Sequence, residues 1–364
     1  MLGLSLYGDA LYILVACIFF FGLARVVVRD GKLILVNRVV ELFFVFLIIA
    51  VVSYDISLRP GDMEGDTAVY INFFNDLNAG LENPFQTFEP GFIELVKLFG
   101  YLSLGYQDLF YVITFSFLWS YYVLAREILG RKSLWPLFVF GVVLFYPFFF
   151  SLTANIIRQG FSLCLVNFAL YFFVKGVNKR GGLLVLLAVL FHKSSVIFFP
   201  IVLLRSWILK FNVFGVICLW FVVSLLSYVK FFGLLTILLF DFLSGYGLVV
   251  NYTDVDGIDY VTGFRWDFWL FSSFSVFLLC TLKLLGENLY KTEAYIFFVC
   301  ALLSCLHIAM LDVAYNDRFG IYSWIFYPIE IAYVIRSVGE NFASGNRRNN
   351  AQRSILAKQG EAEC

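Results

Sequence analysis

The chain has 364 residues, of which 61% are apolar and only 14% are charged, and its mean hydropathy is +0.87. Soluble domains carry roughly a quarter charged residues, so this composition excludes a soluble globular protein and predicts an all-α, polytopic integral membrane protein. Lys plus Arg and Asp plus Glu both total 26. The resulting net charge of zero gives no reason to expect a nucleic acid partner.

Apolar windows of roughly 17–25 residues predict about eleven transmembrane helices. The pair 182–192 and 194–209 could instead be one broken span, and two further apolar pieces, 91–105 and 231–243, are expected to be re-entrant or interfacial. The predicted spans lie near residues 4–24, 39–54, 107–125, 134–151, 159–175, 182–192, 194–209, 213–229, 264–285, 293–312 and 319–335.

Basic residues are divided unevenly between the two sets of connections. One set, with the C-terminal tail, holds 19 Lys and Arg residues, and the other holds seven: Arg59, Lys97, Arg158, Lys193, Lys230, Arg265 and Arg318. Because cytoplasmic loops are enriched in Lys and Arg, the N-terminus is expected outside and the C-terminus in the cytoplasm. We expect one transmembrane domain over 1–339, with external loops 55–90 and 244–263, and a polar cytoplasmic tail over 340–364.

The first external loop carries candidate catalytic carboxylates. A short helix is predicted around residues 67–78, where Asp66 and Tyr70 share one face because they are four positions apart. Glu89-Pro90-Gly91 is expected to form a tight turn that presents the carboxylate. These groups suit recognition or deprotonation of a sugar hydroxyl, and the alternative is a solvated acidic loop.

Three arginines stand at predicted span starts on the external side, each beside Asn or Asp. A guanidinium next to free helix N-terminal amides suits a phosphate, and three together suggest a pyrophosphate site. The alternatives are that Arg158 snorkels to lipid headgroups and that the aspartates only neutralise Arg265 and Arg318. The segments are Asn155 to Gln159 around Arg158, Arg265 to Asp267, and Asn316 to Arg318.

A histidine marks the break between two short apolar pieces. His192 is followed by Lys193, Ser194 and Ser195, and we interpret it as a base or orienting group or as a polar pin between helices. His307 is expected to be a packed interior residue. Six of the seven cysteines lie in apolar runs and no zinc, calcium or nucleotide motif is present, so neither a metal nor a cofactor is expected.

The ordered set of motifs resembles the EpsG-type branch of the bacterial O-antigen and exopolysaccharide polymerases (Wzy). It covers roughly residues 60–335. The motifs are Asp66-x-x-x-Tyr70, Glu89-Pro-Gly-Phe92, Asn155-x-x-Arg158-Gln159, His192-x-Ser194-Ser195, Arg265-x-Asp267 and Asn316-Asp-Arg318.

This resemblance implies a glycosyltransferase of the bacterial inner membrane with an architecture like that of the GT-C enzymes. It would join undecaprenyl-pyrophosphate-linked repeat units on the periplasmic side during lipopolysaccharide or exopolysaccharide biosynthesis, and release undecaprenyl pyrophosphate. A flippase that delivers the units and a chain-length regulator are further implied partners, and no nucleotide sugar or obligatory metal is needed.

In this scheme each motif residue has an expected role. The base is His192, with Glu89 or Asp66 as second choices, and preorganised arginines would stabilise the leaving pyrophosphate. The pyrophosphate-binding residues are Arg158, Arg318 and Arg265, and the substrate-binding residues are Tyr70, Asn155, Gln159, Lys193, Ser194, Ser195, Asp267 and Asn316.

Other function classes predict different features. A lipid-linked oligosaccharide flippase would show a repeat and a site near the bilayer midplane, whereas the polar groups here gather on one face. A membrane acyltransferase of surface glycans would need access to a cytoplasmic donor, and a non-catalytic chain-length regulator would not need arginines at span starts. These three classes are the alternatives to a polymerase.

Overall fold

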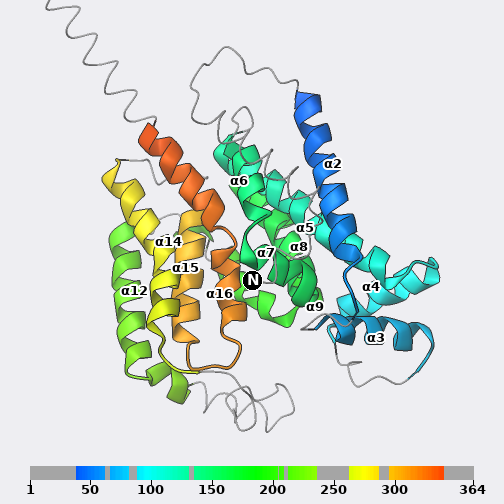
Figure 1. Cartoon of the computed structure of the whole chain (residues 1–364). Coiled ribbons are helices and arrows are strands. Elements are labelled where there is room, and N and C mark those ends of the chain that lie inside the picture. The colour runs from blue at the N-terminus through cyan, green and yellow to red at the C-terminus, as the bar shows by residue number, and fades with distance from the viewer. Residues whose placement is uncertain are drawn as a thin grey trace, which may run out of the picture. The chain divides into compact units, whose positions relative to one another are not determined.

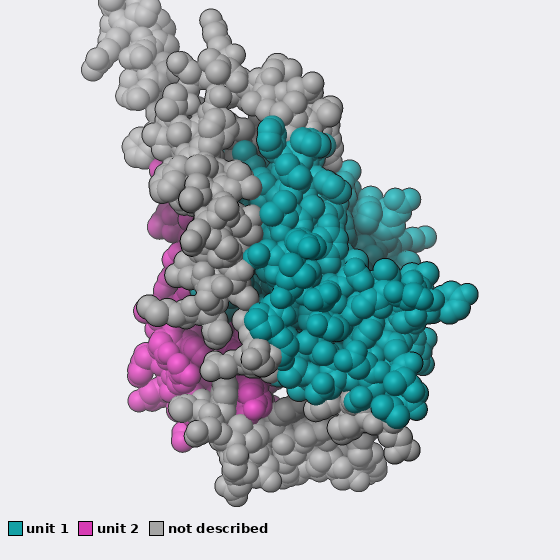
Figure 2. Space-filling view, turned by 45° about the vertical axis from the view of Figure 1, so that its right-hand side comes forward, with its two compact units in different colours: residues 1–210 teal, residues 211–364 magenta. Residues whose placement is uncertain are grey.

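The computed structural model describes residues 38–61, 66–81, 88–130, 135–203, 205–208, 212–235, 262–286 and 295–339. All regular structure in these ranges is helical (Figure 1), which confirms the all-α class. The predicted first span at 4–24, most of the loop 244–263 and the tail 340–364 lie outside the described residues. The chain divides into two compact units, residues 1–210 and 211–364, coloured separately in Figure 2.

The first unit is built around α5, which packs against α2 and α8, while α8 packs against α9. α3 and α4 lie side by side (Figure 1). The helices of this unit are α2 (Arg38–Ser57), α3 (Thr67–Asn78), α4 (Pro90–Tyr101), α5 (Tyr106–Leu129), α6 (Trp135–Val143), α7 (Pro147–Phe150), the π-helical turn η1 (Ser151–Asn155), α8 (Ile157–Val174), α9 (Asn178–Phe191), the 3₁₀ turn η2 (Lys193–Ile197), α10 (Phe198–Leu203) and α11 (Arg205–Ile208).

An aromatic cluster joins α3, α4 and the start of α5. The rings of Tyr70, Phe73, Phe92 and Phe110 are buried together, and the Tyr70 and Phe92 rings meet edge to face with centroids 5.8 Å apart. Aromatic pairs in this geometry are stabilising beyond their buried area. The cluster therefore fixes the positions of the two short helices that carry Tyr70 and Glu89.

The second unit is a smaller bundle in which α15 packs against α12, α14 and α16. Its helices are α12 (Val213–Tyr228), α14 (Trp266–Leu284), α15 (Tyr295–Ala309) and α16 (Asp317–Trp324), and residues 231–235 and 327–339 are also helical. Inside it, the Ser272 hydroxyl accepts from Trp324 Nε1 at 3.0 Å and lies 2.6 Å from His307 Nδ1. His307 is thus the packed, hydrogen-bonded interior residue that was expected.

Three described helices, α5, α8 and α14, are long and apolar enough to cross a membrane. The bent pair of residues 135–143 and 147–155 raises the number to four if it counts as one span. α12 and α15 are apolar but shorter. The chain is therefore a helical membrane protein, but the described residues do not confirm the eleven predicted spans.

Two local expectations have different outcomes. The predicted short helix matches α3, Thr67–Asn78, and the predicted break falls at His192, where the backbone is extended between α9 and η2. The prediction of a tight turn at Glu89-Pro90-Gly91 was wrong. Proline has no backbone N–H and a fixed φ, so it suits the first position of a helix, and α4 begins at Pro90 with Glu89 as its N-cap.

Candidate active site

Arg158 projects from the start of α8, directly after the π-helical turn η1. Gly160 permits this arrangement, because a Cβ atom at residue 160 would lie 2.0 Å from the Leu152 carbonyl oxygen. No side chain larger than that of glycine fits there without moving η1 away from α8. The Arg158-Gln159-Gly160 sequence therefore fixes where the guanidinium stands.

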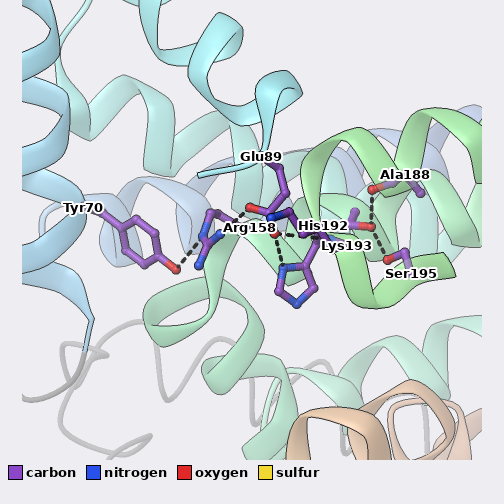
Figure 3. Close-up of polar contacts among 8 residues, drawn as sticks. Tyr70, Glu89, Arg158, Ala188, His192, Lys193 and Ser195 are labelled. Atoms are coloured by element: carbon purple, nitrogen blue, oxygen red, sulfur yellow. Dashed lines mark hydrogen bonds and ion pairs between the residues drawn. The ribbon is translucent and has the colours of Figure 1, made fainter. Parts of the chain in front are cut away.

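Glu89 is the residue on which the site converges (Figure 3). Its side chain is buried, with 5% of the residue exposed. Oε2 accepts a short hydrogen bond from Arg158 Nη1, and Oε1 accepts from the Lys193 backbone N–H at 3.2 Å and lies 3.4 Å from His192 Nδ1. Three segments distant in sequence, at Glu89, Arg158 and His192-Lys193, thus meet at one carboxylate.

These contacts keep Glu89 ionised. Burial raises the pKa of the carboxyl, but the hydrogen bond with His192 and the charge of Arg158 outweigh burial and lower its pKa to about 2. Opposite charges and hydrogen bonds to the ionised form act in this direction. A carboxylate with so low a pKa is a weak base at neutral pH.

Two aromatic residues complete the surroundings of Arg158. Its Nε lies 3.5 Å from the Tyr70 hydroxyl, and Cζ lies 4.0 Å from the centroid of the Phe88 ring. A guanidinium over an aromatic face gains from the charge distribution of the ring. Arg158 is therefore held from three sides, by Glu89, Tyr70 and Phe88.

The serines after His192 pack between helices. Ser195 is fully buried and its Oγ lies 2.5 Å from the hydroxyl of Ser162, which donates to the Ala188 carbonyl at 2.8 Å. Ser194 lies in the same 3₁₀ turn η2. Ser195 therefore ties the start of this turn to α8 and α9 and so supports the extended backbone of His192.

Asp66 and Asn155 meet through the backbone. The Asp66 N–H donates to Asn155 Oδ1 at 2.8 Å, which attaches the start of α3 to the turn before α8. Gln159, the next residue after Arg158, is fully buried. The structure thus brings together Tyr70, Glu89, Arg158, His192 and Lys193 as one cluster, with Asp66 and Asn155 attached to its supports.

The remaining predicted site residues belong to the second unit. Arg265 is the N-cap residue of α14, where its guanidinium binds the Asp267 carboxylate, with Nη2 to Oδ2 at 2.5 Å. It also lies over the Phe268 ring at 3.8 Å. Arg265 therefore has the aspartate partner that sequence reasoning raised as its alternative role.

The Asn316-Asp317-Arg318 segment begins α16. Asn316 is fully buried, and its Nδ2 donates to the carbonyls of Leu311 and Val313 at 3.0 Å each. The Arg318 guanidinium lies 4.9 Å from the centroid of the Tyr315 ring. Tyr315 adopts a φ of 57°, which is rare for a side chain of this size.

The sequence did not indicate the roles of Phe88, or of Gly91 and Gly160, the two glycines where neighbouring backbones approach closely. Gly91 stands where a Cβ atom would lie 2.7 Å from the Leu190 carbonyl oxygen of α9. Gly91 was visible as a member of the Glu89-Pro-Gly-Phe92 motif, whereas Gly160 lies one residue beyond the Arg158-Gln159 motif. The neighbour that excludes a side chain at each becomes apparent only from the fold. Among the described residues, no cluster of His, Cys, Asp and Glu could hold a metal ion.

Comparison with known families identifies the chain at the level of its class. The sequence matches the EpsG family over residues 42–348, so the protein belongs to this family, and the resemblance drawn from the motifs is confirmed. The family is associated with glycosyltransferase-like polysaccharide polymerases. Searches of curated proteins and of solved structures gave no match.

Proposed function

We propose that this protein is a polymerase that joins undecaprenyl-pyrophosphate-linked oligosaccharide repeat units at the periplasmic face of the bacterial inner membrane. One observation supports this function above the alternatives. A single buried carboxylate, Glu89, holds an arginine and a histidine on its two oxygens. Transfer of a glycan from a pyrophosphate carrier needs such a pair, a cation for the leaving group and a base for the incoming hydroxyl.

His192 is the proposed base. A proton on Nδ1 directed at Glu89 Oε1, 3.4 Å away, leaves Nε2 as the basic nitrogen of the neutral ring. A carboxylate that orients a histidine in this way sets its tautomer and stabilises the imidazolium that forms. Glu89, with a pKa of about 2, then acts as a positioning residue, which favours His192 over Glu89 as the base.

The proposed step is a displacement at the anomeric carbon of the donor glycan. The acceptor hydroxyl oxygen forms the new glycosidic bond while its proton passes to His192 Nε2. The bond between the anomeric carbon and the pyrophosphate oxygen breaks, and its electron pair leaves with undecaprenyl pyrophosphate. Arg158 stabilises the charge that develops on that oxygen.

Arg318, and Arg265 beside Asp267, belong to the second unit and stay predicted pyrophosphate-binding residues. Asp66 remains a further candidate base. Donor and acceptor would lie with their polyprenyl chains in the membrane and their sugars outside it. A GT-C-like arrangement of the helices suits this placement, because lipid-linked donors reach such a site laterally from the bilayer.

Surface-glycan gels of a knockout strain complemented with variants test this function. Removing one transition-state donor typically costs about 10²–10³ in rate, so Arg158→Ala should leave a single capped repeat unit while the protein still inserts in the membrane. Arg158→Lys keeps the charge without the planar fork and should give shortened chains. Arg180→Ala, at an exposed arginine of α9, is the matched control and should give full-length polymer.

The other function classes give different gels. A strain that lacks all surface glycan would indicate a flippase, and full-length glycan without one decoration would indicate an acyltransferase. Normal ladders from Arg158→Ala would rule out the proposed role of this arginine.

For His192→Asn we expect a large loss of polymer together with loss of the acid limb of the pH–rate profile, because asparagine cannot take the proton.

A further inference from the structure

A second buried arginine stands beside the candidate site. Arg59 follows the end of α2, with only 4% of the residue exposed. Its Nε donates to Thr67 Oγ1 at 3.2 Å and its Nη1 to the Ile56 carbonyl at 3.1 Å. Its Cζ lies 3.7 Å from the centroid of the Phe110 ring. The side chain is therefore fixed in one orientation by three neighbours.

Arg59 differs from Arg158 in lacking a counterion. No described carboxylate forms an ion pair with Arg59, and its buried Nη2 has no hydrogen-bond partner in the described part of the chain. Burial lowers the pKa of Arg59 to about 10, against an opposing effect of Tyr70, so the guanidinium stays protonated at neutral pH. A buried charge without a partner is costly, and a bound anion would remove that cost.

The two arginines are fixed to the same piece of backbone. Thr67, which accepts from Arg59, itself donates to the Ala154 carbonyl at 3.0 Å. Asn155, the next residue, accepts from the Asp66 N–H, and α8 with Arg158 begins two residues later. The position of Arg59 is thus coupled to the position of Arg158 through the start of α3.

Tyr70 is the neighbour that both arginines share. Its hydroxyl lies 3.5 Å from Arg158 Nε and it also interacts electrostatically with Arg59. Arg59, Arg158 and Glu89 together carry one net positive charge, and the exposed Lys193 on the turn beside them adds a second. Two positive charges match a diphosphate that is esterified at both ends, which carries two negative charges.

We propose that Arg59 is the second anion-binding residue of this site, and that Arg59 Nη2 and Arg158 bind the two phosphate groups of one diphosphate. This inference rests on the proposed function and deepens it, because it names the group that the first unit recognises. A guanidinium suits phosphate oxygens in both geometry and charge. Tyr70 lies beside both guanidinium groups and donates its hydroxyl proton to the same ligand.

Binding of soluble probes to the purified full-length protein in detergent tests this assignment. Calorimetry measures the affinity for three probes. Farnesyl diphosphate against farnesyl monophosphate compares two phosphates with one, and farnesyl diphosphate against inorganic pyrophosphate compares a ligand with a prenyl chain and one without. The wild-type protein should prefer the prenyl diphosphate to the monophosphate. Hydrogen bonds to charged groups contribute about 1.5–3 kcal/mol, so Arg59→Gln should reduce that preference by roughly 10- to 100-fold and leave monophosphate affinity nearly unchanged.

Two further variants make the result decisive. Arg59→Lys retains the charge without the fork and should lose only part of the preference, so it reports on the site even if Arg59→Gln fails to fold. Arg180→Gln, at the exposed arginine of α9, should behave like the wild type.

Contrary results separate the two proposals. An Arg59→Gln protein that keeps the full preference for diphosphate would overturn the role of Arg59 but leave the polymerase function standing. A wild-type protein without preference for two phosphates over one would also overturn it. Stronger binding of inorganic pyrophosphate than of farnesyl diphosphate would support the two-phosphate site and assign it to the free anion. The polymerase function itself is tested separately by the glycan gels of the knockout strain, whatever the result for Arg59.

Discussion

At the scale of single residues, Glu89 organises the site because each of its two carboxylate oxygens contacts a different segment of the chain. One oxygen binds Arg158, and the other faces His192 and the backbone of Lys193. A buried ion pair contributes little net stability when intact, but removal of one partner leaves an uncompensated charge. The site therefore depends on Glu89 for geometry more than for chemistry.

The first prediction concerns Glu89→Gln. The substitution keeps the shape but leaves Arg158 without its counterion, a loss that typically costs about 3–5 kcal/mol when one member of a buried pair is removed. We expect a lower melting temperature in detergent and a strong loss of polymer. Glu94→Gln is the matched control, because Glu94 lies on the same helix in an exposed pair with Lys97, where the expected effect is about 0–1 kcal/mol.

The difference in melting temperature between the wild type and Glu89→Gln should depend on pH with a definite sign. Because the folded-state pKa of Glu89 is lowered to about 2, its stabilising contribution is fully present above the unfolded pKa of about 4.3. It is lost as the pH falls through about 2. The melting-temperature gap between wild type and Glu89→Gln should thus not narrow between pH 8 and pH 5. A gap that closes near pH 6 would show that Glu89 is not held ionised by these partners.

How much of the site the sequence predicts depends on the residue. Arg158 and His192 were predicted because charged and polar groups stand out in apolar runs, and Tyr70 and Glu89 because of their spacing and motif in the external loop. The structure places the four together. Arg59 was counted only as an external basic residue, although its buried Nη2 has no hydrogen-bond partner in the described part of the chain. Whether a guanidinium has a counterion depends on which side chains converge on it, and local spacing carries no such information.

At the scale of helices, small residues set the distances between the elements that carry the site. α4 meets α9 at Gly91, where a Cβ atom would lie 2.7 Å from the Leu190 carbonyl oxygen. Leu190 belongs to the last turn of α9, two residues before His192. The separation of Glu89 from His192 is therefore set by a contact between backbones.

The second prediction is that Gly91→Ala separates these helices without altering any charged residue. The added methyl group must displace α4 or the end of α9 by several tenths of an ångström, and a misplacement of about 1 Å can cost about 10²-fold in rate. We expect polymer yield to fall sharply while the protein still inserts and purifies.

Gly176→Ala provides the contrast for Gly91→Ala. Gly176 has a positive φ of 77° but nothing within 4 Å of an added Cβ, so its cost is backbone strain far from Glu89. That variant should lower stability slightly and leave polymer length unchanged. Equal polymer from Gly91→Ala and the wild type would show that the α4 to α9 contact does not set the geometry of the site.

Helix boundaries were predictable where a residue with strong backbone preferences marks them. α3 matched its predicted range. α4, α7 and the helix 327–339 begin at or next to a proline, namely Pro90, Pro147 and Pro328. Hydropathy windows take no account of these prolines as helix starts. The expected span 319–335 is accordingly divided at residues 325–326. The π-helical turn η1 has no comparable sequence signal, because its extra residue is stabilised by packing against Gly160.

At the scale of the whole molecule, the composition was sufficient to identify a helical membrane protein but not its topology. Hydropathy windows count apolar residues, whereas a span also needs an unbroken helix of about 20 residues. α9, with 14 residues, is about 21 Å long at 1.5 Å per residue. It is shorter than the hydrocarbon core of about 30 Å, and yet the predicted topology requires it to cross.

The last prediction tests that crossing. The excess of basic residues in one set of connections predicts that Arg180 lies in the cytoplasm and Lys193 outside. Arg180 is exposed near the start of α9, and Lys193 is exposed just after its end. In a background with Cys218 and Cys364 replaced by serine, Lys193→Cys should react with an impermeant maleimide in intact spheroplasts. Arg180→Cys should react only after permeabilisation. Reaction of both from outside would make α9 re-entrant, and reaction of Arg180→Cys alone would place the Glu89 cluster on the cytoplasmic side, where no lipid-linked repeat unit delivered by a flippase could reach it.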